Sequence, residues 1–156
     1  MSTPITDIYS DYGEIRSLVN IPAHGKGRDR KEKYEKTMKG FLSVYGEDIE
    51  ASCAELAAAE DRQAWLASYG ERFVDGASDH LKGFRGKVPA AKKMDATFFT
   101  IMFVLPLIRM TDAEGSQDLA QAACDAWSER FNYPDMRVAD HKEILNSFST
   151  KFLGIF

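Results

Sequence analysis

The chain has 156 residues, 44% of them hydrophobic, and a formal net charge of −4. A chain of this length forms one domain and buries roughly two-thirds of the surface that its unfolded state exposes. The apolar share excludes a disordered chain, and the net negative charge argues against a dedicated nucleic-acid binder. We therefore expect a single helical domain over residues 1–156 that folds without a cofactor.

Three features bear on where the protein resides. The first residues, Met1–Asp7, lack the basic and apolar regions of a secretory signal. Cys53 and Cys124 stand 71 positions apart, with no zinc-ligand spacing, and we expect two buried free thiols. The longest apolar stretch, 96–108, spans only about 20 Å as a helix, against roughly 30 Å for a bilayer core. These features predict a cytoplasmic protein without a membrane partner.

Helical periodicity recurs along the chain, whereas apolar and polar residues do not alternate as strands require. The first expected helix follows Thr3, with Pro4 at its first position, and ends near Asn20. The longest carries apolar residues every three or four positions from Tyr34 to Leu56, and its glycines allow a bend or a break. A third opens near Asp61 and continues to Phe84.

The second half of the chain predicts three more helices. An apolar helix near 94–108 should lie in the middle of the assembly, with Pro106 kinking or ending its last turn. Thr111 and Glu114 have capping-box spacing, and the helix that follows contains small residues that allow close packing. A last apolar stripe covers 144–155. The fold class is therefore all-α, a single compact bundle of about six helices around the helix near 94–108.

Motifs for catalysis, cofactors or metals are not found. The motif Gly-x-Ser-x-Gly and the glycine patterns of phosphate-binding loops are absent. The three histidines are scattered, and His80, although close to Asp75 and Asp79, points about 100° away from Asp79 around a helix. We assign no catalytic, cofactor or metal residue, and we expect that the protein is not an enzyme.

Basic residues gather in two segments. Residues 26–39 carry seven basic and three acidic side chains, and residues 82–93 carry five basic and none acidic. Together they hold a net +9, so the rest of the chain holds −13. If they meet on one face, they form an anion patch for phosphate or nucleic acid. Its candidate residues are Lys26, Arg28, Arg30, Lys31, Lys82, Arg85 and Lys87.

Apolar residues suggest two further kinds of surface. An aromatic-rich core can leave a cavity for a small apolar ligand, and the C-terminal segment must be either docked or exposed. If exposed, it is a candidate interface for a homodimer, since closed two-fold dimers are common. Its candidate residues are Phe152, Leu153, Ile155 and Phe156.

The sequence does not establish a function. The best interpretation is a non-enzymatic interaction or self-assembly module in the cytoplasm, whose partner is an unknown protein or a second copy. The alternatives are a regulatory domain for a small apolar ligand and an anion or nucleic-acid binder acting through segments 26–39 and 82–93. Fold class alone does not decide among them.

Overall fold

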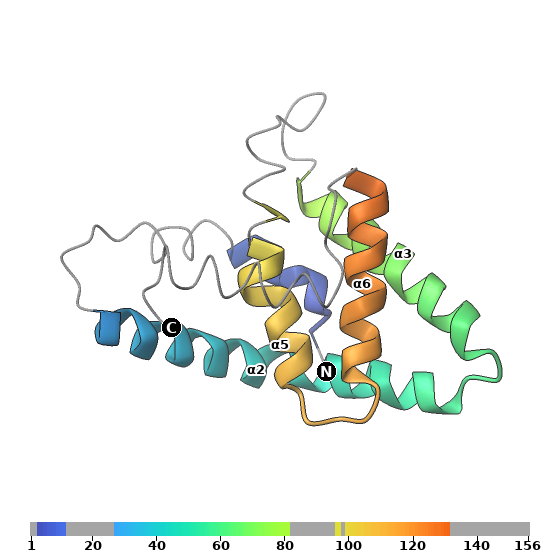
Figure 1. Cartoon of the computed structure of the whole chain (residues 1–156), viewed down its shortest axis with the longest axis horizontal. Helices are drawn as coiled ribbons and strands as arrows, with labels where there is room; N and C mark the ends of the chain where they lie inside the picture. The colour runs from blue at the N-terminus through green and yellow to red at the C-terminus, as the bar shows by residue number, and fades with distance from the viewer. Residues whose placement is uncertain (1–2, 12–26, 82–95, 98, 132–156) are drawn as a thin grey trace.

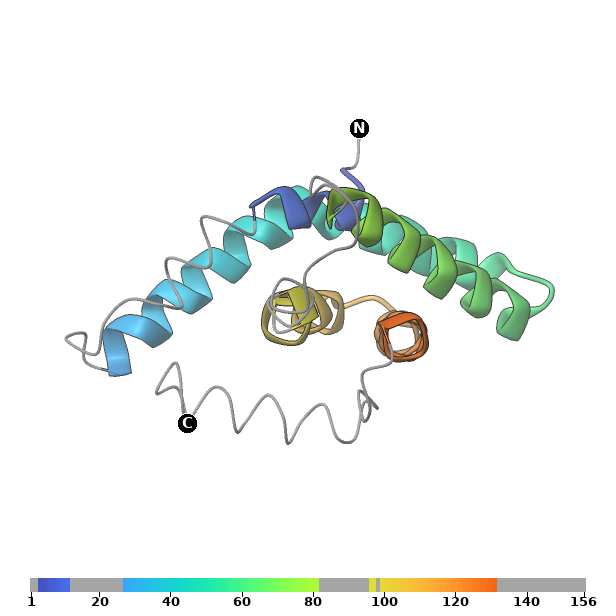
Figure 2. The ribbon, with the colours of Figure 1, turned by 90° about the horizontal axis from the view of Figure 1, so that it is seen from above.

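The chain folds into helices arranged in two layers. The structure is a computed structural model that describes residues 3–11, 27–81, 96–97 and 99–131. For residues 27–31, 33, 34 and 81 it describes the backbone only. Figure 2 shows η1, α2 and α3 in one layer and α5 and α6 beneath them. The elements are the 3-10 helix η1 (Ile5–Asp11), α2 (Gly27–Ala58), α3 (Arg62–Leu81), the π-helical turn η2 (Thr100–Val104), α5 (Leu105–Met110) and α6 (Ser116–Phe131).

The all-α fold class is confirmed, because the described residues contain helices and no strand. Since η2 runs directly into α5, the described ranges hold five helices rather than six. The sixth expected helix, at 144–155, lies outside the described residues, as does the predicted extension of the first helix to Asn20. Helix α2 is a single unbroken helix of 32 residues, so its glycines do not break it.

Local chemistry explains where α3 and α6 begin, and it corrects one prediction. Helix α3 begins near Asp61, as expected, and Asp61 caps it by accepting a hydrogen bond from the backbone N–H of Ala64 (3.1 Å). Thr111, predicted to cap the following helix, instead ends α5 and donates its hydroxyl to the Leu107 carbonyl (3.2 Å). Helix α6 begins only after Gly115, whose φ of +92° favours glycine. The capping-box prediction was wrong because a positive-φ turn separates the two helices.

The apolar helix near 94–108 is central, as predicted, and its described part is buried from Ala96 to Ile108 except for half-buried Pro106. Pro106 does not end the helix, because the helix continues to Met110. The widened turn η2 precedes it, and the N–H of Leu105 donates to Thr100, five residues back. A proline lacks an N–H and its ring collides with the carbonyl four residues earlier, so a π turn at this place accommodates the ring.

Two buried hydrogen bonds tie the central helix to its neighbours. The Trp127 indole N–H donates to the Thr97 hydroxyl (3.0 Å). The Thr100 hydroxyl donates to the Ala96 carbonyl (2.8 Å), so the Tyr9 hydroxyl, 2.6 Å away, is the donor of its bond to Thr100. Tyr9 also stacks on Trp127, with ring centroids 5.9 Å apart. Aromatic packing with satisfied polar groups therefore fixes η1 and α6 around the central helix.

Helix η1 is held at both ends by polar groups of the neighbouring helices. Half-buried Asp48 on α2 accepts the backbone N–H of Ile5 (2.9 Å). The Tyr45 hydroxyl donates to Asp11 (3.3 Å), and His80 on α3 contacts Asp7 (3.2 Å). Because a 3-10 helix leaves its first N–H groups without internal partners, Asp48 supplies an acceptor that the helix itself lacks.

Helices α3 and α6 form the largest helix-helix contact among the described elements. They run parallel, since Arg62 lies beside Asp118 at one end and Asp75 beside Arg130 at the other. Between these ends, a β-carbon added to Gly70 would stand 2.7 Å from the carbonyl oxygen of Ala122. Only glycine permits this approach, so the predicted close packing by small residues is confirmed.

We expect Gly70→Ala to lower the free energy of unfolding by about 1–3 kcal/mol, because the added methyl must push α6 away from α3. Gly40→Ala on α2 is the matched control, since nothing lies within 4 Å of its added β-carbon. It should raise stability by about 1 kcal/mol through helix propensity alone. Urea unfolding followed by circular dichroism measures both. Equal shifts in the two variants would show that the α3–α6 contact is not tight.

Asp48 gives the protein a stability that depends on pH. Burial is the main reason that its pKa lies above the ordinary value of 3.8. A carboxyl with a raised folded-state pKa contributes stability that is fully present below about pH 3.8 and is lost as pH rises through the folded value. Asp48→Asn keeps an acceptor for Ile5 without the charge. It should therefore be more stable than wild type at pH 7, and equally stable below about pH 3.8.

The control for this prediction is Asp48→Ala, which removes the acceptor and should lower stability at pH 7 by about 0.5–2 kcal/mol. Thermal unfolding at several pH values compares the three proteins. The explanation fails if Asp48→Asn is the less stable protein at pH 7, because a charged acceptor would then outweigh the cost of burial.

Candidate functional site

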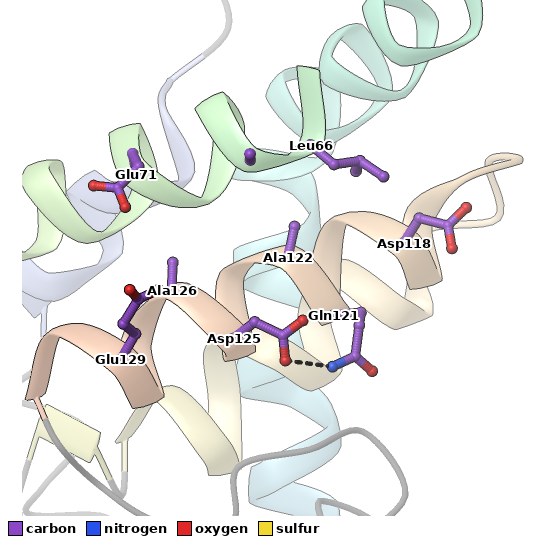
Figure 3. Close-up of a pocket in the computed structure, with 9 residues that line it drawn as sticks. Leu66, Glu71, Asp118, Gln121, Ala122, Asp125, Ala126 and Glu129 are labelled. Carbon is purple, nitrogen blue, oxygen red and sulfur yellow. Dashed lines mark hydrogen bonds between the residues drawn. The ribbon is translucent and has the colours of Figure 1, made fainter. Parts of the chain in front are cut away.

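A groove along the contact between α3 and α6 is the candidate site. Its volume is about 380 Å³, and it is open to solvent along the helix pair. Figure 3 shows side chains from both helices facing this groove. The lining residues are Leu66, Ala67 and Glu71 from α3, and Asp118, Gln121, Ala122, Asp125, Ala126 and Glu129 from α6.

Small side chains create the hollow. Gly70 brings the two backbones together, and the added β-carbon there would also stand 3.0 Å from the Ala126 methyl. Ala67, Ala122 and Ala126 project too little to fill the space beside this contact, so the groove has an apolar floor. Behind the floor, Ala123 and Trp127 on the opposite side of α6 are fully buried.

Carboxylates form the rims of the groove, and arginines neutralise its two ends. Arg62 pairs with Asp118 at the end where both helices begin. At the other end Arg130 donates to Glu71 and to Asp75, at 2.8 Å each. Both carboxylates favour the charged guanidinium, and the pKa of Arg130 is raised above its ordinary value by them, Asp75 first. The arginines therefore leave the middle of the groove acidic.

Asp125 and Glu129 carry the negative charge of the groove that the arginines do not neutralise. Among the described residues neither carboxylate forms an ion pair, although Asp125 accepts a hydrogen bond from the Gln121 amide (2.8 Å; Figure 3). An ionised carboxylate only accepts hydrogen bonds, so this part of the groove favours a cation that donates them. Since the floor is apolar, the site fits a lysine or arginine with aliphatic neighbours better than an isolated ion.

The predicted site residues are not brought together in the described part of the chain. Lys26, Lys82, Arg85 and Lys87 lie outside it, and Arg28, Arg30 and Lys31 lie in the first turns of α2, where only the backbone is described. The anion patch therefore stays a prediction. The candidate interface of Phe152, Leu153, Ile155 and Phe156 also lies outside the described residues.

The acidic residues considered for metal binding have other partners. Asp75 pairs with Arg130, and His80 contacts Asp7 on η1. Within the described ranges, no group of three or more potential ligands is placed to hold a metal ion.

Sequence reasoning missed the groove, although part of the pattern was visible. Asp118, Ala122, Asp125 and Glu129 recur at helical spacing on one side of α6, next to its small residues. An acidic stripe on a helix is usually a solvated face, and nothing in the sequence pairs it with α3. The position of Gly70 opposite Ala122 belongs to the tertiary structure. It brings the small residues of α3 and the acidic stripe of α6 to the same groove.

Comparison of the chain with protein-family models, curated proteins and solved structures gave no match. None of the described helices has both the length and the apolar character needed to cross a bilayer.

The two cysteines should be inert in the folded protein. Both are buried and neither forms a disulfide, as predicted, and burial raises the pKa of Cys53. Since the thiolate is the reactive form, an aromatic disulfide reagent should modify neither thiol in native buffer and both after denaturation in urea. The released chromophore measures this. Rapid modification of either thiol in native buffer would place a reactive cysteine in the folded protein.

Proposed function

We propose that this chain is a non-enzymatic interaction module of the cytoplasm that binds a basic protein segment in the groove between α3 and α6. The observation that carries the proposal is an apolar floor beside the carboxylates of Asp125 and Glu129, which form no ion pair with any residue that the structure describes. A positively charged segment with small apolar residues would cover the floor and neutralise the rims.

The dimensions of the groove support a short extended segment. The α6 residues that line it run from Asp118 to Glu129, a rise of about 17 Å along the helix. An extended chain advances roughly 3.3 Å per residue, so about five residues match this length. A segment of that size is in the range of short recognition motifs that combine a few side-chain anchors with backbone contacts.

The energetics predict binding that is modest and sensitive to salt. An exposed ion pair contributes about 0.2–1 kcal/mol, and salt screens it. The apolar floor adds the part of the affinity that salt does not remove, since burial of apolar area does not depend on ionic strength in the same way. Charge therefore controls which partner binds and how fast it associates.

The groove does not support the two alternative functions, binding of a small apolar ligand and binding of an anion. Its carboxylates repel phosphate groups, and they disfavour an apolar ligand that would leave them buried without partners. An apolar-ligand domain and an anion binder acting through 26–39 and 82–93 stay as predictions from the sequence.

A titration with a labelled peptide tests the proposal. The probe is a short fluorescent peptide of alternating lysine and alanine, with a glutamate-for-lysine peptide as its charge control. Asp125→Lys with Glu129→Lys should weaken binding of the lysine peptide by about tenfold or more, the effect of replacing two attractions by two repulsions. Fluorescence anisotropy at low and moderate salt measures the affinity.

Two further variants make the test specific to the groove. Glu47→Lys with Glu50→Lys changes the same charge on the exposed face of α2 and should leave binding nearly unchanged. Ala67→Trp fills the groove without changing its charge and should also weaken binding, because Ala67 lines the groove and is exposed. If both double charge reversals weaken binding equally, the attraction is general and the groove is not the site.

A further inference from the structure

One arginine of the chain shows how a guanidinium is held by two carboxylates that lie one helical turn apart. Arg130 on α6 donates from its two terminal nitrogens to Asp75 and to Glu71 on α3, at 2.8 Å each. The two carboxylates are four residues apart, so they lie on one face of α3. The contact forms although the Glu71 and Asp75 side chains are 61% and 62% exposed, so it does not require a buried site.

Asp125 and Glu129 repeat this spacing inside the groove. They are again an aspartate and a glutamate four residues apart, both are exposed, and both line the groove (Figure 3). Neither forms an ion pair with any residue that the structure describes. Asp125 accepts a hydrogen bond from Gln121 (2.8 Å), and a carboxylate has about four acceptor positions, so it can accept others. The pair therefore has the spacing of the Arg130 site but, within the described ranges, no guanidinium.

The floor of the groove suits the remainder of an arginine side chain. Ala122 and Ala126 line the groove beside the two carboxylates and present methyl groups to it (Figure 3). The methylene stem of an arginine can lie along such an apolar surface while its charged end reaches polar groups. The groove thus offers one surface for the stem and another for the guanidinium.

A guanidinium and an ammonium differ in how they bind a pair of carboxylates. The guanidinium is a planar fork with five N–H donors and is weakly hydrated, so it can contact two carboxylates at once. The lysine ammonium is a compact and strongly hydrated point charge, and at an exposed site its ion pairs contribute little. The same positive charge should therefore bind more tightly here as arginine than as lysine.

We propose that the partner of the groove binds by an arginine side chain whose guanidinium bridges Asp125 and Glu129 and whose stem lies on Ala122 and Ala126. This inference rests on the proposed function, because it names the side chain by which a basic segment binds the same groove. The partner is then selected by one arginine at this position, and not by its total positive charge.

Two peptides of equal charge test the inference. The first is the fluorescent peptide of alternating lysine and alanine, and the second has arginine in place of its central lysine. General electrostatic attraction is the same for both peptides, so it cancels in the ratio of their dissociation constants. Fluorescence anisotropy with the wild-type protein should give a ratio of about three to ten in favour of the arginine peptide.

Single substitutions assign the ratio to the pair of carboxylates. Asp125→Asn and Glu129→Gln each leave one carboxylate, so either should lower the ratio by about twofold or more. Glu50→Gln on the exposed face of α2 removes the same charge away from the groove and should leave the ratio unchanged. Circular dichroism verifies that each variant is folded.

The outcomes separate this inference from the proposed function. Equal affinities of the two peptides for the wild-type protein, or a ratio that neither groove variant lowers, would overturn the arginine assignment. In that case, binding of the lysine peptide that Asp125→Lys with Glu129→Lys weakens would still support a groove for basic segments. If neither peptide binds, both the inference and the proposed function fail.

Discussion

The close contact between Gly70 and Ala122 determines the geometry of the α3–α6 helix pair. Because α3 has no side chain at this point, its backbone meets the backbone of α6 with no room for a β-carbon. The same approach aligns the ends of the helices, where Arg62 meets Asp118 and Arg130 meets Glu71 and Asp75. It also leaves space between alanine side chains. The same close contact therefore produces both the helix pair and the groove.

The layer beneath this contact keeps it in place. Trp127 lies on the inner side of α6, stacks on Tyr9 and donates to Thr97 in the central helix. A satisfied indole in a packed core resists rotation of α6, since rotation would leave a buried N–H without an acceptor. The acidic residues on the outer side of α6 are thereby held in a fixed orientation toward the groove (Figure 3).

The sequence predicted the helices well, because their apolar residues follow the helical period. Ile5, Ile8 and Tyr9 of η1, the stripe of α2 and the buried helix near 94–108 are where that pattern places them. It did not predict the π turn before Pro106 or the role of Thr111 at the end of α5, because both depend on backbone geometry that several residues determine together. The groove was also missed, since a stripe on one helix does not reveal the helix it faces.

We propose the groove between α3 and α6 as the surface that binds a basic segment. Amide chemical shifts of the isotopically labelled protein, titrated with the unlabelled peptide of alternating lysine and alanine, test this proposal. We expect the amides that shift to lie in residues 66–71 and 118–129, and their shifts to become smaller as salt is added. Shifts centred on the exposed face of α2, or no shifts at all, would contradict it.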